Sequence, residues 1–249
     1  MTRQTVIAYH GVGDPPTGAD VNNLFVSPER FKEQMAYLAA KRRVVPLAEL
    51  VAGDPGGSKP AVAITFDDGY RHLLQTALPT LERHGFEATV FVPTRWIGER
   101  NVWDPPSTCD LAIMDAHELK DADRRGLRVE SHGHAHIDMR TAAQVEIEED
   151  LMESQRILKA LTGRDPRFLA WPFRDGSQVA QRIAATAGFK AAFSIDQPHA
   201  GAFSFERVQV TPRDGQALFA LKTSGRYIKM RHNPILDATY KVAKRALRR

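Results

Sequence analysis

The chain has 249 residues, a length that fits one barrel of about 250 residues or two smaller domains. Hydrophobic residues make up 43% of it and charged residues 26%, which excludes a chain that is disordered as a whole. The formal net charge of +4 is unevenly distributed, because residues 222–249 contain nine lysines or arginines and one acidic residue. Since residues 1–221 then hold more acids than bases, we expect no nucleic-acid partner.

Cysteine content and hydropathy exclude further classes of protein. The single cysteine, Cys109, cannot form an intramolecular disulfide, so a disulfide scaffold and a cysteine-rich zinc module are both excluded. No run approaches the roughly 18 apolar residues of a membrane-spanning helix, and the apolar run near the start is too short for a signal peptide. We therefore expect a cytoplasmic location.

Short apolar runs alternate with amphipathic stretches along the chain. The runs are predicted to be buried strands, over residues 5–9, 61–66, 89–92, 127–130, 168–171 and 191–195. Helices are predicted between them, over 27–41, 70–84, 143–161 and 177–187; Ser27 and Pro28 open the first, and glycines follow the other three. This alternation predicts an α/β fold, and at this length a closed or nearly closed β/α barrel rather than an open doubly wound sheet. We expect one barrel domain over residues 1–221 and a basic tail over 222–249.

Two adjacent carboxylates follow the second predicted strand. Asp67 and Asp68 come directly after Phe66 and precede Gly69. Neighbouring side chains on an extended chain point in opposite directions, so one carboxylate can bind a cation while the other faces a reacting water. This division of roles suits metal-assisted hydrolysis. The alternative is an ordinary solvated Asp-Gly turn.

Three histidines follow the strand predicted over 127–130, in the segment Ser131-His132-Gly133-His134-Ala135-His136. Imidazoles gathered at a strand exit are typical of a metal site. An extended segment would place all three on one face, whereas a helical turn would align His132 with His136 and direct His134 away. The position at a strand exit favours the turn. The alternative is a solvated loop that binds metal only adventitiously.

In this order, the motifs resemble those of the polysaccharide deacetylases of carbohydrate esterase family 4, which share the NodB homology domain. The resemblance covers most of residues 5–210 and rests on Thr65-Phe66-Asp67-Asp68-Gly69-Tyr70, on the histidine segment and on Ala170-Trp171-Pro172-Phe173. It implies a distorted β/α barrel in which Asp68, His132 and His136 hold one divalent ion, most often zinc. It also implies that Asp67 is the general base and that the backbone N–H of Phe173 contributes to the oxyanion hole.

The N-terminal segment resembles one branch of this family, the biofilm poly-N-acetylglucosamine deacetylases. The similarity lies in Val6-Ile7-Ala8-Tyr9-His10-Gly11-Val12 and in the stretches 27–31 and 44–47. In that branch the histidine of the Tyr-His pair approaches the metal, so the resemblance makes His10 the general acid. The alternative is a histidine that only caps the first strand.

The third motif departs from the family pattern. Ala170 stands where many members have an arginine that orients the base, and the biofilm branch also lacks that arginine, so the residue that orients Asp67 is left open. Arg174 replaces a glycine, and Trp171 and Phe173 replace tyrosines. We expect Trp171 and Arg174 to contact the substrate; the alternative for Trp171 is a buried core aromatic.

Together these features predict a metal-dependent hydrolase that removes N-acetyl groups from an N-acetylated amino sugar in an oligosaccharide, a polysaccharide or a lipid-linked glycan. An acetamide is a poor electrophile, so the reaction needs a Lewis acid, a base for the water and an acid for the leaving amine. One alternative is a deformylase or other small-amide hydrolase on the same barrel. Another is a carbohydrate-binding protein with an inactive site, against which the intact metal and base motifs argue. The oligomeric state does not follow from the sequence.

The basic tail is predicted to end in an amphipathic helix that begins at about residue 233. Asn233 suits the N-cap, Pro234 suits the first helical position, and Asp237 favours the positive helix start. The pattern predicts either a terminal helix docked on the barrel with solvated charges or a peripheral anchor on an anionic membrane.

Overall fold

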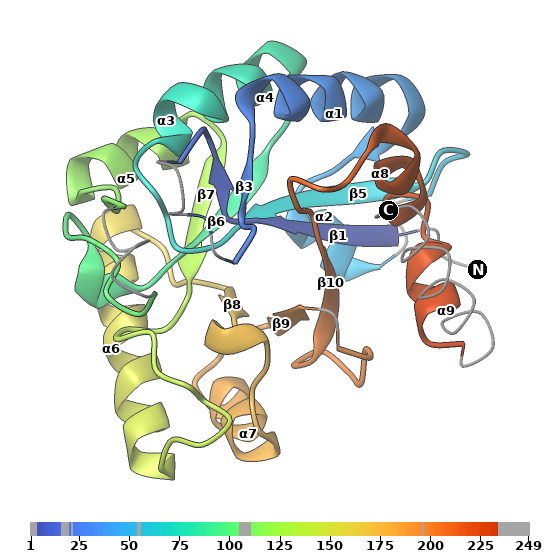
Figure 1. The fold of residues 1–249 in the computed structure, drawn as a ribbon. Helices are drawn as coiled ribbons and strands as arrows, with labels where there is room; N and C mark the ends of the chain where they lie inside the picture. The colour runs from blue at the N-terminus through green and yellow to red at the C-terminus, as the bar shows by residue number, and fades with distance from the viewer. Residues whose placement is uncertain are drawn as a thin grey trace.

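Seven parallel strands close into a barrel in the part of the chain that the structure describes (Figure 1). The structure is a computed structural model that describes residues 4–15, 20, 22–53, 56–104, 111–195 and 197–233. The order around the ring follows the order along the chain: β1 Gln4–Tyr9, β5 Ala61–Phe66, β6 Ala88–Val92, β7 Leu127–Ser131, β8 Phe168–Ala170, β9 Ala191–Ile195 and β10 Phe205–Gln209. The ring closes at β1, which pairs with β5 on one side and with β10 on the other. The predicted β/α barrel is confirmed, and each predicted strand belongs to the ring.

Three short strands of the described chain lie outside the ring. β4 Arg43–Val44 pairs in parallel with the start of β5. β2 Gly11–Val12 and β3 Phe25–Val26 form a separate two-stranded parallel sheet.

Both faces of the ring strands are covered. This explains why β5 and β6 are almost wholly apolar and do not alternate between apolar and polar residues.

Helices cover the outside of the ring (Figure 1). α1 Pro28–Lys41 begins as predicted, because the Ser27 side chain accepts the N–H of Arg30 and a proline occupies the first turn. α6 Gln144–Thr162 ends at a glycine in the left-handed conformation, again as predicted, and α7 Gln178–Thr186 is the next long helix. The other described helices include α2 Leu47–Ala52, α5 Ala116–Arg124, α8 Gln216–Lys222, α9 Tyr227–Arg231 and the 3-10 turns η1 Thr94–Trp96 and η2 Pro172–Arg174.

The single helix predicted over residues 70–84 is wrong. The structure has two helices there, α3 Leu73–Thr76 and α4 Leu78–His84. Pro79 has no N–H to donate to the carbonyl of Gln75, so the helix breaks between the two. Tyr70 lies outside both helices and forms a β-bridge with Ile113.

The C-terminal part of the described chain packs on the barrel. α8 crosses the boundary expected after residue 221, and Lys222 forms a buried ion pair with Asp214. His232, just after α9, pairs with Glu206 on β10 at 2.8 Å. The helix predicted from about residue 233 falls on residues 234–249, which are outside the described part of the chain, as is Cys109. Within the described part, no helix is both long enough and apolar enough to cross a membrane.

Candidate active site

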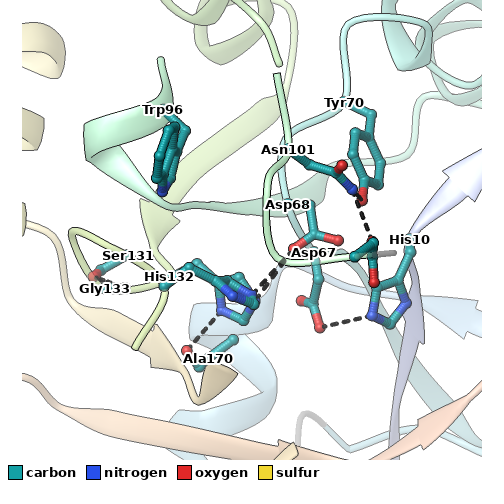
Figure 2. A network of polar contacts seen from close by, with 12 residues as sticks. His10, Asp67, Asp68, Tyr70, Trp96, Asn101, Ser131, His132, Gly133 and Ala170 are labelled. Carbon is teal, nitrogen blue, oxygen red and sulfur yellow. Dashed lines mark hydrogen bonds and ion pairs between the residues drawn. The ribbon is translucent and has the colours of Figure 1, made fainter. Parts of the chain in front are cut away.

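The two adjacent aspartates leave β5 in different directions. The N–H of Asp67 donates to the carbonyl of Tyr9 at 2.9 Å and extends the pairing of β5 with β1. The chain then turns sharply, because Asp68 and Gly69 both have positive φ, 68° and 70°. A Cβ at Gly69 would lie 3.0 Å from Val92, so glycine fits this turn best. The two carboxylates are buried and face different neighbours (Figure 2).

Asp68, His132 and His136 converge on one point. Oδ1 of Asp68 lies 3.6 Å from Nε2 of His132 and 3.6 Å from Nε2 of His136. Atoms held about 2.1 Å from a tetrahedral zinc ion are about 3.4 Å apart, so the three side chains fit one ion. Burial, followed by the charge of Asp67, raises the pKa of Asp68 well above its usual range. A bound cation would therefore be the favourable partner for this carboxylate.

The surroundings of the two histidines support a ligand role. Nδ1 of His132 hydrogen-bonds the carbonyl of Ala170 at 2.8 Å, which directs Nε2 toward Asp68 (Figure 2). Burial lowers the pKa of both His132 and His136, which favours the neutral imidazole that binds metal. His134 is directed elsewhere, since its Nδ1 bonds the Thr94 hydroxyl at 2.9 Å. The geometry agrees with the prediction that His134 is not a ligand.

Asp150 of α6 holds the histidine segment in place. Its two carboxylate oxygens accept the backbone N–H groups of His134 and Ala135 at 2.6 and 2.7 Å. Gly133 has a φ of 76°, and a Cβ at this position would lie 2.6 Å from Oδ2 of Asp150. The glycine of the motif therefore allows the loop backbone to approach the carboxylate that shapes it.

Asp67 is held by an arginine from the far end of the chain. Arg207 on β10 is fully buried, and its Nη1 and Nη2 donate to the two carboxylate oxygens of Asp67 at 2.6 and 2.9 Å. The same guanidinium donates to the Thr65 hydroxyl at 3.2 Å and lies over the ring of Phe91. Burial alone would raise the pKa of Asp67, but it is lowered to about 2, with the charge of Arg207 as the largest opposing influence. The carboxylate is therefore ionised at neutral pH, as a general base must be.

His10 follows β1 and lies beside Asp67, on the side away from His132 in Figure 2. Its Nε2 is 3.8 Å from Oδ2 of Asp67, and its side chain is 14% exposed. Burial lowers the pKa of His10 to about 4 although Asp67 acts in the opposite direction, so the ring is neutral at pH 7. His10 lines the same pocket as Asp67 and the three candidate metal ligands.

The third motif forms one wall of the pocket. Phe173 and Arg174 both have left-handed backbones, with φ of 52° and 82°, which is strained for residues other than glycine. The Phe173 side chain is 40% exposed and meets the His136 ring edge-on, with centroids 5.0 Å apart. Nη1 of Arg174 donates to Oε1 of Gln209 at 3.3 Å. Both residues line the same pocket as Asp67 and the candidate metal ligands.

Trp171 does not offer an open ring face to a sugar. Only 1% of the residue is exposed, and its Nε1 donates to the carbonyl of Phe203 at 3.1 Å. Gly176 packs against the indole so closely that a Cβ there would lie 2.6 Å from Cδ2. The expectation that Trp171 binds substrate by stacking is therefore wrong, and the buried-aromatic interpretation is correct.

One pocket of about 400 Å³ lies at the C-terminal ends of the strands. Its lining includes His10, Asp67, the three candidate metal ligands, Phe173 and Arg174. In a β/α barrel the residues at this end carry the chemistry. The wall also includes residues that the motifs do not identify: Asn22, Trp103, Asp104, Arg140 and Gln209.

The family model for polysaccharide deacetylases matches residues 54–192, more than half of the chain. This chain belongs to the polysaccharide deacetylase family. The matched segment contains Asp67 and all three candidate metal ligands, whereas His10 and Arg207 lie outside it.

Individual known proteins are also similar to this chain. The poly-beta-1,6-N-acetyl-D-glucosamine N-deacetylase of Staphylococcus aureus is 25% identical over 190 residues, which are 72% of this chain and 63% of that enzyme. The chain thus spans less than two thirds of that relative. Among solved structures, Streptococcus pyogenes deacetylase PplD in complex with acetate has a TM-score of 0.75 at 19% identity, covering 88% of this chain and 97% of that one. IcaB from Ammonifex degensii has a TM-score of 0.73 at 23% identity, covering 89% and 97%. At these identities the two structures establish the fold.

Arg207 is the residue that holds Asp67, the candidate base, and sequence reasoning missed it. It lies in Phe205-Glu206-Arg207-Val208-Gln209, a run that mixes charged and apolar residues and is absent from the predicted strands. The arginine and Asp67 are 140 positions apart and meet only because β1 pairs with both β5 and β10. No local pattern marks such a contact.

Proposed function

We propose that this chain is a metal-dependent N-deacetylase that acts on an N-acetylated amino sugar in an oligosaccharide, a polysaccharide or a lipid-linked glycan. One observation carries the proposal: an ionised Asp67 shares a pocket with the cluster of Asp68, His132 and His136. The name of the Staphylococcus aureus relative, an enzyme acting on an N-acetylglucosamine polymer, supports an amino-sugar substrate.

Zinc is the ion that we propose, because two imidazoles and one carboxylate suit it and leave positions open for water and substrate. When bound, the ion supplies a Lewis acid that polarises the acetamide carbonyl and lowers the pKa of water. Asp67, kept ionised by Arg207, takes a proton from the attacking water. His10, 3.8 Å away, receives that proton and passes it to the amine nitrogen as the C–N bond breaks. The backbone N–H of Phe173 donates to the carbonyl oxygen as it gains negative charge.

Incubation of the zinc-loaded chain with N-acetylglucosamine oligomers and with an N-formyl sugar tests the activity. We expect acetate from the first substrate, measured separately from formate. Release of formate alone would favour the deformylase alternative. Saturable binding of the oligomers without release of either acid would favour the inactive carbohydrate-binding alternative.

Zinc content tests the ligand set without reference to turnover. His132→Ala and His136→Ala are each expected to lose zinc on dialysis, because two remaining ligands hold the ion weakly. His134→Ala is the matched control, since it removes an imidazole from the same segment and is expected to keep zinc. Loss of zinc from the His134→Ala chain, with retention in the His136→Ala chain, would refute this ligand assignment.

For the basic tail we propose peripheral contact with an anionic membrane. Residues 222–249 carry an excess of eight positive charges, each worth about 1 kcal/mol near such a surface. Lys222 and Arg231 form ion pairs with Asp214 and Glu206. We therefore expect the membrane contact to depend mainly on the five lysines and arginines of residues 241–249.

Sedimentation with anionic vesicles tests this contact. We expect binding at low salt that weakens at high salt and disappears when residues 233–249 are removed. If the intact chain stays in the supernatant at low salt, the membrane contact is refuted, and the alternative of a terminal helix docked on the barrel is favoured.

A further inference from the structure

We infer that Trp103 positions the candidate metal ligand His136 and that Asn101 anchors the segment that carries Trp103. The inference rests on the metal site proposed above. Both residues lie in the segment 99–104, which follows η1 and contacts the site without contributing a candidate ligand.

The two histidines of the site are held in different ways. A metal-binding histidine usually donates its second ring N–H to a carbonyl or a carboxylate, which fixes the rotation of the ring. His132 has such a partner in the carbonyl of Ala170. Nδ1 of His136 is buried and has no hydrogen-bond partner on any other described residue. The ring of His136 therefore needs another restraint.

Aromatic contacts supply this restraint. The indole of Trp103 stacks on the His136 ring, with centroids 4.1 Å apart and planes 21° apart. Phe173 meets the same imidazole edge-on, so rotation of the imidazole would drive it against one of the two rings. A metal-bound imidazole is electron-poor, and the face of an indole attracts such a group better than an aliphatic side chain does. Trp103 thus favours the orientation of His136 in which Nε2 faces Asp68.

Asn101 fixes the segment that carries Trp103. It is fully buried and lies beside Tyr70 in Figure 2. Its Nδ2 donates to the Tyr70 hydroxyl and to the Asp104 carboxylate, at 2.8 Å each. Its backbone N–H donates to the carbonyl of Leu111 at 3.1 Å. Tyr70 directly follows the turn that presents Asp68. Asn101 therefore links the segment that carries Trp103 to the end of β5, which supplies the candidate ligand Asp68.

The test measures metal affinity, because Trp103 also lines the substrate pocket. In the full chain, Trp103→Leu is expected to weaken Zn²⁺ binding about 10- to 100-fold in competition with a chromophoric chelator, and to change the visible spectrum of bound Co²⁺. Trp103→Phe retains an aromatic face and is expected to recover most of the affinity. Asn101→Ala keeps the indole but releases its segment, and is expected to weaken Zn²⁺ binding as well.

Phe86→Leu is the matched control. Phe86 also stacks on a histidine, His84, with centroids 5.3 Å and planes 20° apart, but at the opposite end of the barrel strands. A purely structural effect would lower the Tm of both leucine variants, whereas only Trp103→Leu should change zinc affinity. Wild-type zinc affinity and an unchanged cobalt spectrum in Trp103→Leu would overturn the inference. A Trp103→Phe chain that binds zinc no more tightly than the leucine variant would overturn it as well. Failure of the unsubstituted chain to bind zinc would instead overturn the proposed metal site.

Discussion

Replacing Asp67 by asparagine is expected to lower kcat for acetate release about 10²- to 10⁴-fold while zinc stays bound. Asparagine keeps the shape of the side chain but cannot take a proton from water. Asp67 is not among the three side chains that converge on one point, so the zinc content should match that of the wild type. Acetate release and zinc content, measured on the same samples, check both parts of the prediction.

His10→Ala is the companion variant, and we expect it to keep zinc and lose activity over the same range. Among the described residues, the alanine removes the only histidine beside Asp67 that is not a candidate ligand. Near-wild-type rates in His10→Ala would assign the proton transfer to the amine to another group. Zinc loss in Asp67→Asn would make Asp67 a ligand instead of a base.

The second large effect is expected at Arg207. Lysine keeps one positive charge but cannot make the two parallel hydrogen bonds of a guanidinium, so the pKa of Asp67 should rise above its value of about 2. A base works only when it is deprotonated, so the acid limb of kcat/KM should move to higher pH. At neutral pH the misoriented base should still cost about 10²-fold. A pH profile of Arg207→Lys beside the wild type checks the direction and the size.

Arg207→Gln should also destabilise the fold. It leaves Asp67 as an unpaired buried carboxylate, which costs about 3–5 kcal/mol. The double variant Asp67→Asn/Arg207→Gln removes both charges and should recover part of that loss. Urea unfolding of the two single variants and the double variant measures the coupling between the two side chains. Wild-type stability in Arg207→Gln, with an unshifted pH profile in Arg207→Lys, would show that this pair does not hold the base.

The barrel and the metal ligands are predictable because local signals encode them. Apolar runs mark the buried strands, and caps and glycines mark the ends of α1 and α6. The aspartate pair and the histidine segment each lie in one short stretch at a strand exit. All strand exits of a parallel barrel meet at one end, so two local motifs are enough to predict that their side chains converge.

The remaining features depend on contacts between distant segments. Arg207 reaches Asp67 only through closure of the ring, and Trp103 reaches His136 from a segment with no motif of its own. Trp171 lies in a recognisable motif, but the packing of Gly176 decides that its ring is buried. The error over residues 70–84 differs, since its cause is local: Pro79 outweighs the helical spacing of its neighbours.

The closure of the ring also brings together the residues around Asp67. Asp67 extends β5, His10 follows β1, and Arg207 lies on β10, three strands that are neighbours around the ring. β1 and β10 come from opposite ends of the described chain, and both lie outside residues 54–192. The candidate metal ligands follow β5 and β7, which are inside that segment. The side of the pocket around Asp67 therefore depends on the pairing of the first and last strands of the ring, whereas the candidate metal ligands all come from one continuous segment of the chain.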